Sequence, residues 1–519
     1  MEPTAPPAPP PGTPPSAPAA PSAAARASAP HVWTLRAGAD KRFRAGHPWV
    51  YSNELAHSPR GAAQRPVAPG DPVELRDAAG RFLARGYGHP GTLIAFRALS
   101  RDPAEAEPWG EAALLARLRR AAALRHGLGL GAVSHRLVFG EADDLPGLVV
   151  DRYRLAPPDA AAGERGPAGI AAQVLAVQAH TAGAERLQEP LLAALEALVT
   201  EEHAADPRHP DWAHTAVVLR NDAGARRLEG LPDDAVRVAR PGPGLALTPA
   251  RVLTAPVAGD GRSAGPPGPA VLQADLLGGQ KTGLFLDQAA NLRLAAGLLA
   301  ARLRSESGSF GTPGSMGATA APGPMGATAA PGPMGATAAP LRILDLFAYV
   351  GAWGAALARV GAAAGRAVEV TVVDASAPAL ALAVANVTAA GGACTPLRAD
   401  VLADAQGPLA ALPPGGFDVV VADPPAFIKG RKAWHTGRAA YVKLNTAALR
   451  WVRPGGLLVT CSCSQLLSEA DFLAVLDKAA ARAGTPVRWI ARGGQAPDHP
   501  VRAGFPEGDY LKARIGVVG

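Results

Sequence analysis

The sequence predicts an α/β protein with a small β domain, a middle α/β domain and a C-terminal, doubly wound, mostly parallel sheet. After residue 340, short apolar runs alternate with helical Ala/Leu patterns, which is the rhythm of βαβ units. The chain has 519 residues, which exceeds one hydrophobic core, so several domains are expected. We place their boundaries at 31–103, 104–277 and 278–519.

The C-terminal domain is organised around residues 341–354. Strands are expected at Leu341–Leu346, Val368–Val373, Thr395–Leu397, Asp418–Ala422 and Leu457–Cys461, with helices at Gln288–Arg304, Ala352–Val360 and Ala377–Ala390. Because parallel strands end at one edge of the sheet, a ligand is expected in the crevice there.

The loop after the first of these strands carries the main cofactor signal. It opens through Tyr349, Gly351 and Gly354 into a helix, so backbone N–H groups can approach a ligand closely. A dinucleotide fingerprint needs a third glycine, and a phosphate-binding G-x-x-x-x-G-K-[ST] string does not occur. The spacing therefore favours a nucleoside cofactor without a pyrophosphate.

Acidic residues recur where these strands end. Asp374 can accept both hydroxyls of a ribose, although Asp is also a common helix N-cap. Asp400 can bond an adenine amino group. Asp345 can orient the loop or meet an ammonium group.

Two further strand ends point to a substrate. Asp423-Pro-Pro-Ala-Phe427 forms a rigid turn that presents Asp423 and nearby carbonyls to a planar, hydrogen-bonding group. In Thr460-Cys-Ser-Cys-Ser464, we interpret Cys461 as a buried apolar residue and Cys463, at the strand's mouth, as functional. The cations that follow the turn, Lys429, Arg431 and Lys432, suit phosphates.

The N-terminal β domain is the most basic segment. Residues 31–101 hold 11 Lys/Arg against 5 Asp/Glu in a chain of net charge +7, which favours a binding surface over a genome-wide arginine bias. RNA contact is predicted for Lys41, Arg42 and Arg44, while Trp49 can either stack on an unpaired base or belong to the core. Strands are expected at Asp71–Asp77, Gly80–Arg85 and Leu93–Arg97.

The middle domain shows no chemical motif, and we expect it to position the substrate. Its predicted elements are a helix at 104–126, a strand–turn–strand unit at Arg136–Asp151, strands at Gln173–Gln178 and Ala216–Arg220, and a helix at Ala184–Val199.

Low-complexity segments interrupt the three domains. We expect residues 1–30 to be a disordered Pro/Ala-rich tail, and 307–340, with its repeated MGATAAPGP, to be a flexible insertion. Residues 156–169 and 256–269 are predicted loops. The sequence shows no signal peptide or membrane span, too few cysteines for a disulfide framework, and no metal site, which predicts a cytoplasmic protein.

The combined motifs resemble a known family. The chain resembles bacterial class I S-adenosylmethionine (SAM)-dependent methyltransferases of the RlmI type, which form 5-methylcytosine in 23S rRNA. The matching strings are GHPWVYSNEL, GRFLARG, GEADDLPGLVVDRY, QKTGLFLDQ, DLFAYVGAWG, DPPAF, CSCS and DHPVRAGFPEGDYLK. The resemblance runs from about residue 32 to 515. It implies a PUA domain, a middle α/β domain and a Rossmann-like domain with a seven-stranded sheet.

The resemblance also implies roles for individual residues. Cofactor contacts are expected from Phe285, Gln288, Asp345, Phe347, Tyr349, Gly351, Asp374, Asp400 and Asp423. Cys463 is the expected nucleophile, and Asp423 the group that bonds the cytosine edge. The base that removes the C5 proton is unassigned, with Cys461 and water as the options. RNA contacts are expected from Lys41, Arg42, Arg44, Trp49, Lys429 and Lys432.

Other functions stay open at this point. The alternatives are methyl transfer to a nitrogen or to guanine in RNA, a non-catalytic rRNA-binding assembly factor, and an oxidoreductase of the nicotinamide type, which the missing glycine disfavours. The sequence leaves open which nucleotide is modified, whether naked rRNA or a large-subunit precursor is the substrate, and whether the protein forms a homodimer.

Overall fold

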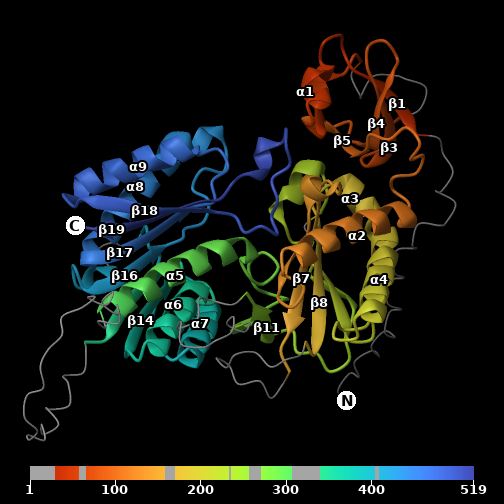
Figure 1. Cartoon of the computed structure of the whole chain (residues 1–519). Coiled ribbons are helices and arrows are strands. Elements are labelled where there is room, and N and C mark those ends of the chain that lie inside the picture. The colour runs from red at the N-terminus through yellow and green to blue at the C-terminus, as the bar shows by residue number, and fades with distance from the viewer. Residues whose placement is uncertain are drawn as a thin grey trace, which may run out of the picture.

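The computed structural model describes residues 30–57, 66–157, 170–232, 235–255, 270–306, 339–403 and 408–519. The predicted N-terminal tail, most of the repeat insertion, and the 256–269 loop lie outside these residues. Three sheets form three bodies, with the N-terminal sheet next to the middle one and the C-terminal sheet beside it (Figure 1).

The N-terminal body is a small five-stranded sheet in the order β1-β3-β4-β5-β2. Its elements are β1 (His31–Thr34), α1 (Asp40–Arg44), β2 (Trp49–Tyr51), β3 (Asp71–Arg76), β4 (Phe82–Gly88) and β5 (Ile94–Ser100). Alternate apolar side chains such as Trp33, Val50, Leu75 and Phe96 are buried in its core. The three strands predicted from the sequence are present as β3, β4 and β5.

The middle body is a mixed sheet in the order β10-β9-β8-β7-β11-β12, with β6 also paired to β7. Its strands are β6 (His135–Phe139), β7 (Leu148–Leu155), β8 (Ala172–Ala179), β9 (Thr215–Leu219), β10 (Arg237–Arg240), β11 (Ala250–Thr254) and β12 (Ala270–Ala274). Its helices are α2 (Glu111–Gly127), α3 (Ala182–Arg186) and α4 (Gln188–Ala205). Leucines of α2 and α4 cover one face of this sheet.

The prediction of a helix from residue 104 was wrong at its N-terminal end. The helix α2 begins only at Glu111, and Gly110 before it has an extended backbone with ψ of 157°. Pro108 explains this difference, because proline disfavours the helical conformation of the residue that precedes it.

The C-terminal body is a seven-stranded sheet in the order β15-β14-β13-β16-β17-β19-β18. Its strands are β13 (Leu341–Leu346), β14 (Val368–Asp374), β15 (Ala393–Arg398), β16 (Phe417–Ala422), β17 (Val452–Ser462), β18 (Val487–Gly494) and β19 (Lys512–Val518). The first five in chain order are parallel to one another, and β19 runs antiparallel to both β17 and β18. The predicted mostly parallel, doubly wound sheet is confirmed.

Helices cover both faces of the C-terminal sheet (Figure 1). They are α5 (Ala289–Glu306), α6 (Ala352–Ala363) and α7 (Ala377–Ala389) on one face, and α8 (Trp434–Trp451) and α9 (Glu469–Ala483) on the other. The strand order reverses between β13 and β16, which opens a crevice at their carboxyl ends.

The middle sheet buries its second face against the C-terminal body. Tyr153 and Val174 of this sheet share one apolar cluster with Tyr349 and Val350 of the loop after β13, and with Ala379 of α7. The loop predicted to hold a cofactor is thus supported from outside its own domain.

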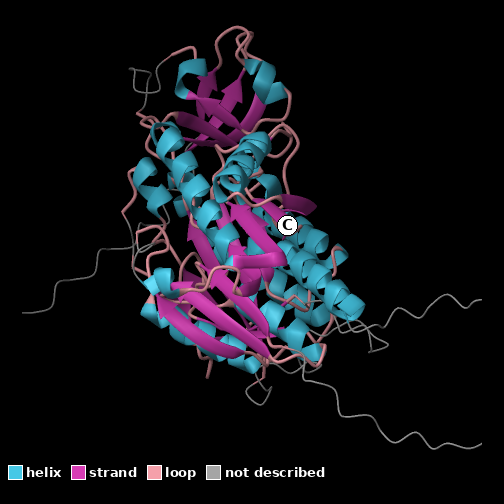
Figure 2. Ribbon diagram, turned by 90° about the vertical axis from the view of Figure 1, so that its left-hand side faces the viewer, coloured by secondary structure: helices cyan, strands magenta, loops and turns pink. Residues whose placement is uncertain are grey.

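One C-terminal segment, residues 498–510, joins all three bodies. The ring of Trp49 packs edge-on against Phe505 with centroids 4.7 Å apart, and its indole Nε1 donates to Glu141 Oε1 at 2.8 Å. Buried Arg125 of α2 donates to the carbonyl of Asp498 at 2.8 Å. This segment explains how the N-terminal sheet is held at one end of the molecule (Figure 2). Within the described residues, no helix is long and apolar enough to cross a membrane.

A buried ion pair ties the middle sheet together. Asp151 is fully buried and accepts hydrogen bonds from Arg136 Nε and Nη2 at 2.8 and 2.9 Å, and from Thr282 Oγ1 at 2.5 Å. We expect Asp151→Asn to destabilise the fold by about 3 kcal/mol or more, because it leaves the Arg136 charge buried without its counter-ion. The measurement is the midpoint of thermal unfolding, followed by circular dichroism.

The matched control is Glu201→Gln, which removes the partner of Arg119 in an exposed ion pair. Surface pairs of this kind contribute about 1 kcal/mol or less, so this midpoint is expected to move little. Equal shifts in the two variants would contradict the role given to Asp151.

Candidate active site

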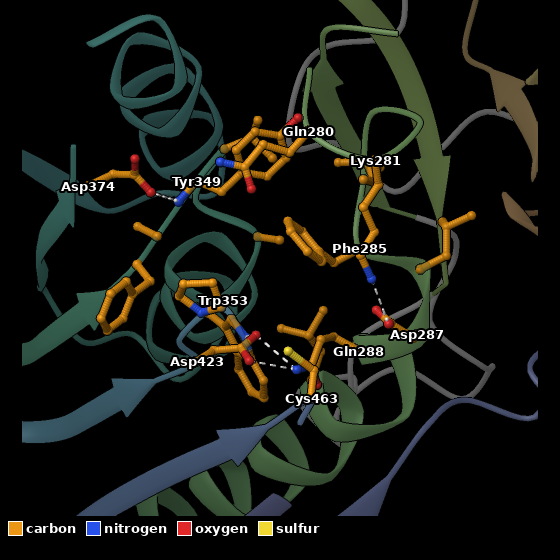
Figure 3. Close-up of a pocket in the computed structure, with 18 of the residues that line it drawn as sticks. Gln280, Lys281, Phe285, Asp287, Gln288, Tyr349, Trp353, Asp374, Asp423 and Cys463 are labelled. Carbon is orange, nitrogen blue, oxygen red and sulfur yellow. Dashed lines mark hydrogen bonds and ion pairs between the residues drawn. The ribbon is translucent and has the colours of Figure 1, made fainter. Parts of the chain in front are cut away.

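A large cavity lies at the carboxyl edge of the C-terminal sheet (Figure 3). Its volume is about 680 Å³, within the roughly 300–1,000 Å³ typical of ligand pockets. Its lining includes the loop after β13, the ends of β14 and β15, the turn after β16, Cys463 after β17, and residues 280–288 before α5. Residues of the middle sheet, α5 and α6 complete the wall.

The loop after β13 has an unusual backbone. Phe347 and Tyr349 have φ of 59° and 50°, values that residues other than glycine rarely adopt. Backbone strain of this kind is concentrated at functional sites. Gly351 has φ of 73°, and a Cβ there would lie 2.9 Å from the Cα of Ala383 in α7. Glycine is therefore required at 351 by both conformation and packing, although Gly351 itself does not line the cavity.

Two carboxylates hold this loop in place. Asp374 Oδ2 accepts the Tyr349 N–H at 2.9 Å, and Asp345 Oδ2 accepts the Gly354 N–H at 2.9 Å. Asp374 lines the cavity, but Asp345 is fully buried beneath the loop and does not. Of the two roles predicted for Asp345, the structure supports orienting the loop rather than meeting a ligand.

Burial raises the pKa of Asp345 to about 8. The Gly354 N–H opposes this shift, while the nearby charges of Asp423 and Asp374 add to it. The second carboxyl oxygen of Asp345 is buried without a hydrogen-bond partner. A protonated carboxyl therefore suits this position near neutral pH.

Asp374 and Asp400 both line the cavity and come from the ends of the neighbouring strands β14 and β15. Asp374 is not the N-cap of α7, since Ser376 caps that helix by accepting from the Ala379 N–H. Asp400 is exposed, and its Oδ1 accepts from the N–H groups of Leu402 and Ala403. Both carboxylates are therefore fixed by backbone donors while they face the cavity.

Asp423 lines the cavity and lies beside Trp353, Gln288 and Cys463 (Figure 3). Gln288 Nε2 donates to both of its carboxyl oxygens at 2.8 Å, and Trp353 Nε1 donates to Oδ2 at 3.1 Å. Burial raises the pKa of Asp423 to about 6, against the Trp353 hydrogen bond. The sequence analysis did not predict that Trp353 contacts Asp423. Its position two residues after Gly351, at the start of α6, could have indicated a site residue.

Cys463 lies one residue beyond the end of β17 and lines the cavity. Its thiol donates to the Pro424 carbonyl at 3.8 Å, and burial followed by the Asp423 charge raises its pKa to about 11. Cys461 is fully buried in the apolar core, as expected, and is not a lining residue. The strand ends at Ser462, between the two cysteines, so they do not continue along one strand face.

Residues 280–288 bring Phe285 to the cavity, as expected, in addition to Gln288. Phe285 lies edge-on to Tyr349 with ring centroids 5.5 Å apart, and both rings line the cavity together with Phe347. The hydroxyl of Tyr349 donates to the Gly283 carbonyl at 2.9 Å, which ties the loop after β13 to this segment.

The cations predicted to bind RNA fall into two groups. In the N-terminal body, Lys41 is exposed, but Arg42 pairs with Glu54 at 3.0 Å and Arg44 with Asp77 at 2.8 Å. Trp49 is engaged by Phe505 and Glu141, which gives it a packing role; its stacking on RNA stays a prediction. By contrast, Lys429, Arg431 and Lys432 are all exposed, directly after Phe427 in the cavity wall.

Comparison with known proteins agrees with this architecture. Residues 34–101 match the family of PUA-like domains. Two solved structures, one assigned as a methyltransferase and complexed with SAH and one assigned as a SAM-dependent methyltransferase from Streptococcus mutans, match with TM-scores of 0.61 and 0.60. At 14% and 15% identity they cover 94% of this chain and 100% of their own. These matches confirm the predicted fold and N-terminal domain.

Curated relatives align along nearly the whole chain. A protein of Photobacterium profundum is 29% identical over 482 residues, 92% of this chain and 97% of its own. One of Shewanella denitrificans is 28% identical over 493 residues, 93% of this chain and 98% of its own. Both are named ribosomal RNA large subunit methyltransferase I. The resemblance predicted from the motifs is confirmed.

The raised pKa of Asp345 predicts a pH dependence of stability. Its folded pKa of about 8 lies above its ordinary value of 3.8, so the folded state holds an extra proton between them. The free energy of unfolding should therefore fall with rising pH, by up to about 1.4 kcal/mol per unit. Asp345→Asn keeps an acceptor for Gly354 and should remove this slope.

The test compares urea unfolding of the wild type and Asp345→Asn between about pH 6.5 and 8. Asp423, with its lower pKa of about 6, contributes little to the slope in this window. Parallel profiles of the two proteins would show that Asp345 is already ionised in the folded state.

Proposed function

Because the chain is related over 92% of its length to proteins named ribosomal RNA large subunit methyltransferase I, we propose that it methylates carbon 5 of a cytosine in 23S rRNA, with SAM as the methyl donor. The relatives support SAM-dependent methyl transfer to rRNA. The choice of cytosine carbon 5 rests on one observation: the Cys463 thiol and the Asp423 carboxyl face the same cavity as the candidate cofactor residues.

The residues present fit SAM. Asp374 and Asp400 both line the cavity, and their carboxylate oxygens suit ribose hydroxyls and an adenine amino group. Phe347, Tyr349 and Phe285 line the same cavity and provide ring surfaces. When bound, SAM supplies an electrophilic methyl group on its sulfonium. Asp374 holds the strained loop by accepting the Tyr349 N–H.

The substrate base would then lie between Cys463 and Asp423. Carbon 5 of cytosine is a weak nucleophile until a thiolate adds to carbon 6. The Cys463 thiolate would add to carbon 6, and the C5=C6 π electrons would shift onto the ring, which makes carbon 5 nucleophilic. Carbon 5 would take the methyl group as the methyl–sulfonium bond breaks, and S-adenosylhomocysteine would leave as a neutral thioether. Transfer of the carbon 5 proton to a base would then release Sγ from carbon 6 as the thiolate and restore the C5=C6 double bond.

Asp423 suits the Watson–Crick edge of cytosine. As a carboxylate it accepts from the amino group at position 4, and when protonated it donates to N3. Its pKa of about 6 makes both forms accessible near neutral pH. The base that removes the carbon 5 proton was open between Cys461 and water. Water is favoured, because Cys461 is buried away from the cavity.

The raised pKa of Cys463 favours a second candidate, methyl transfer to a nitrogen of an RNA base, which needs no thiolate. A non-catalytic assembly factor is the third possibility. It predicts no heat of SAM binding in isothermal titration calorimetry, whereas the arrangement of Asp374, Asp400 and the loop predicts clear binding. Action on rRNA would take place in the cytoplasm, as predicted from the sequence.

We expect Cys463→Ser to lose methyl transfer by about 10³-fold or more, because the hydroxyl cannot replace the thiolate as the nucleophile. The measurement is incorporation of labelled methyl groups into rRNA, with mass spectrometry of the modified nucleoside. Cys394→Ser, on the far edge strand β15, is the matched control. Full activity of Cys463→Ser, or an N-methylated product, would rule out the thiolate route.

The exposed cations after the Asp423 turn predict a salt-dependent RNA affinity. Lys429→Glu and Lys432→Glu should each weaken RNA binding and lower the slope of log affinity against log salt by about 1, one phosphate contact apiece. The measurement is a filter-binding titration at several salt concentrations. Lys478→Glu, exposed on α9, makes the same charge change elsewhere. An equal loss in this control would show a general charge effect instead.

A further inference from the structure

Lys281 occupies an unusual position in the wall of the cavity (Figure 3). Its backbone has φ of 53°, in the left-handed region that lysine rarely adopts. Its Nζ lies 3.0 Å from Asp287 Oδ2 and 4.8 Å from the centre of the Phe285 ring. The Lys281 side chain lines the cavity while it stays 38% exposed, and these two contacts hold its ammonium group beside Asp287 and Phe285.

Asp287 is the anchor of this ammonium group. It is 3% exposed, and the same Oδ2 also accepts the hydroxyl of Tyr510 at 2.5 Å. Its other carboxyl oxygen is buried without a partner. The ion pair with Lys281 and the Tyr510 hydrogen bond hold the pKa of Asp287 well below its ordinary value despite burial. Asp287 is therefore ionised, and its carboxylate holds the Lys281 ammonium group at 3.0 Å.

The segment that carries Lys281 is tied down on both sides. Thr282 donates to Asp151 and lies 2.7 Å from the hydroxyl of Tyr153, both in the middle sheet. On the other side, Tyr349 of the cofactor loop donates to the Gly283 carbonyl. These bonds leave Lys281 little freedom to move relative to Cys463, which lines the same cavity.

We propose that Lys281 is a positioning residue whose ammonium group stabilises the thiolate of Cys463, and that Asp287 and Tyr510 hold it there. This inference rests on the proposed function and deepens it. It assigns the electrostatic partner that a buried nucleophilic cysteine requires.

The charges around Cys463 explain why such a partner is needed. Burial raises the pKa of its thiol, and the carboxylates Asp423 and Asp287 raise it further. Lys281 acts in the opposite direction and lowers it. Lys281 also lowers the pKa of Asp423, so one cation acts on both reacting side chains.

Among the other titratable groups nearby, Tyr441 and Tyr510 have raised pKa values and stay neutral near pH 7. Cys461 is buried, and its pKa is raised well above the ordinary value. Lys512, at the start of β19, is a second cation near the thiol. It donates to the Ser464 carbonyl at 2.8 Å; burial lowers its pKa, and the charge of Cys463 raises it.

The test is the alkylation of Cys463 by iodoacetamide as a function of pH, without RNA or SAM. The thiol proton goes to water, the thiolate sulfur bonds the CH₂ carbon, and iodide leaves. Peptide mass spectrometry follows Cys463 in a Cys394→Ser background, while Cys461 is buried. Below the thiol pKa, the rate rises with the thiolate fraction, about tenfold per pH unit.

We expect Lys281→Met to slow alkylation about tenfold at pH 8.5 and to move the profile to higher pH by about one unit, as loss of a neighbouring opposite charge predicts. Lys281→Arg keeps the charge and should remain within about threefold of the wild type. Tyr510→Phe should fall between them. Lys478→Met, on the surface of α9, is the control for loss of one charge elsewhere.

Two results would overturn the inference. One is a wild-type profile in Lys281→Met. The other is an equal change in Lys281→Met and Lys281→Arg with a lowered unfolding midpoint, which indicates a structural role. Since alkylation needs neither RNA nor SAM, its outcome is independent of the nucleoside found in the methylation assay. The methylation assay can therefore contradict the proposed function, and the alkylation assay can contradict the role of Lys281, each without the other.

Discussion

Negative charge concentrated at the carboxyl edge of the C-terminal sheet is the constraint on which the site depends. Asp345, Asp374 and Asp423 end or follow neighbouring strands, so parallel pairing brings them together; Asp345 is fully buried, and the other two are partly buried. Like charges in a buried place cannot all ionise freely. The structure meets this by donating N–H groups to each of them and by raising the pKa of Asp345 and Asp423.

The donors that satisfy these carboxylates are what shape the site. The N–H groups of Tyr349 and Gly354 reach Asp374 and Asp345 only because the loop adopts a left-handed backbone. Gln288 reaches Asp423 from the segment before α5. Neutralising buried charge and forming a cavity are thus achieved by the same contacts. The cavity's geometry follows from them.

The middle sheet and the 498–510 segment belong to the site as much as the catalytic sheet does. The middle sheet packs on Tyr349 and holds Thr282 through Asp151, and Tyr510 reaches Asp287. The same C-terminal segment packs on Trp49 of the N-terminal body. Beyond the predicted role in positioning the substrate, the middle domain fixes the segment that carries Lys281 through its buried polar groups.

Local pattern was enough for the elements of the C-terminal sheet and for Asp374, Asp423 and Cys463 as cavity residues, because strand ends and short motifs are read from neighbouring positions. Local pattern did not predict five other features: the start of α2, the burial of Asp345 beneath its loop, the ion pairs of Arg42 and Arg44 within the protein, and the roles of Trp353 and Lys281. Each depends on contacts between residues distant in sequence. The sequence by itself determined which residues end the strands and supply the chemistry. Only the tertiary structure decided which of them share a cavity and which charges act on the thiol, because burial and distance set both.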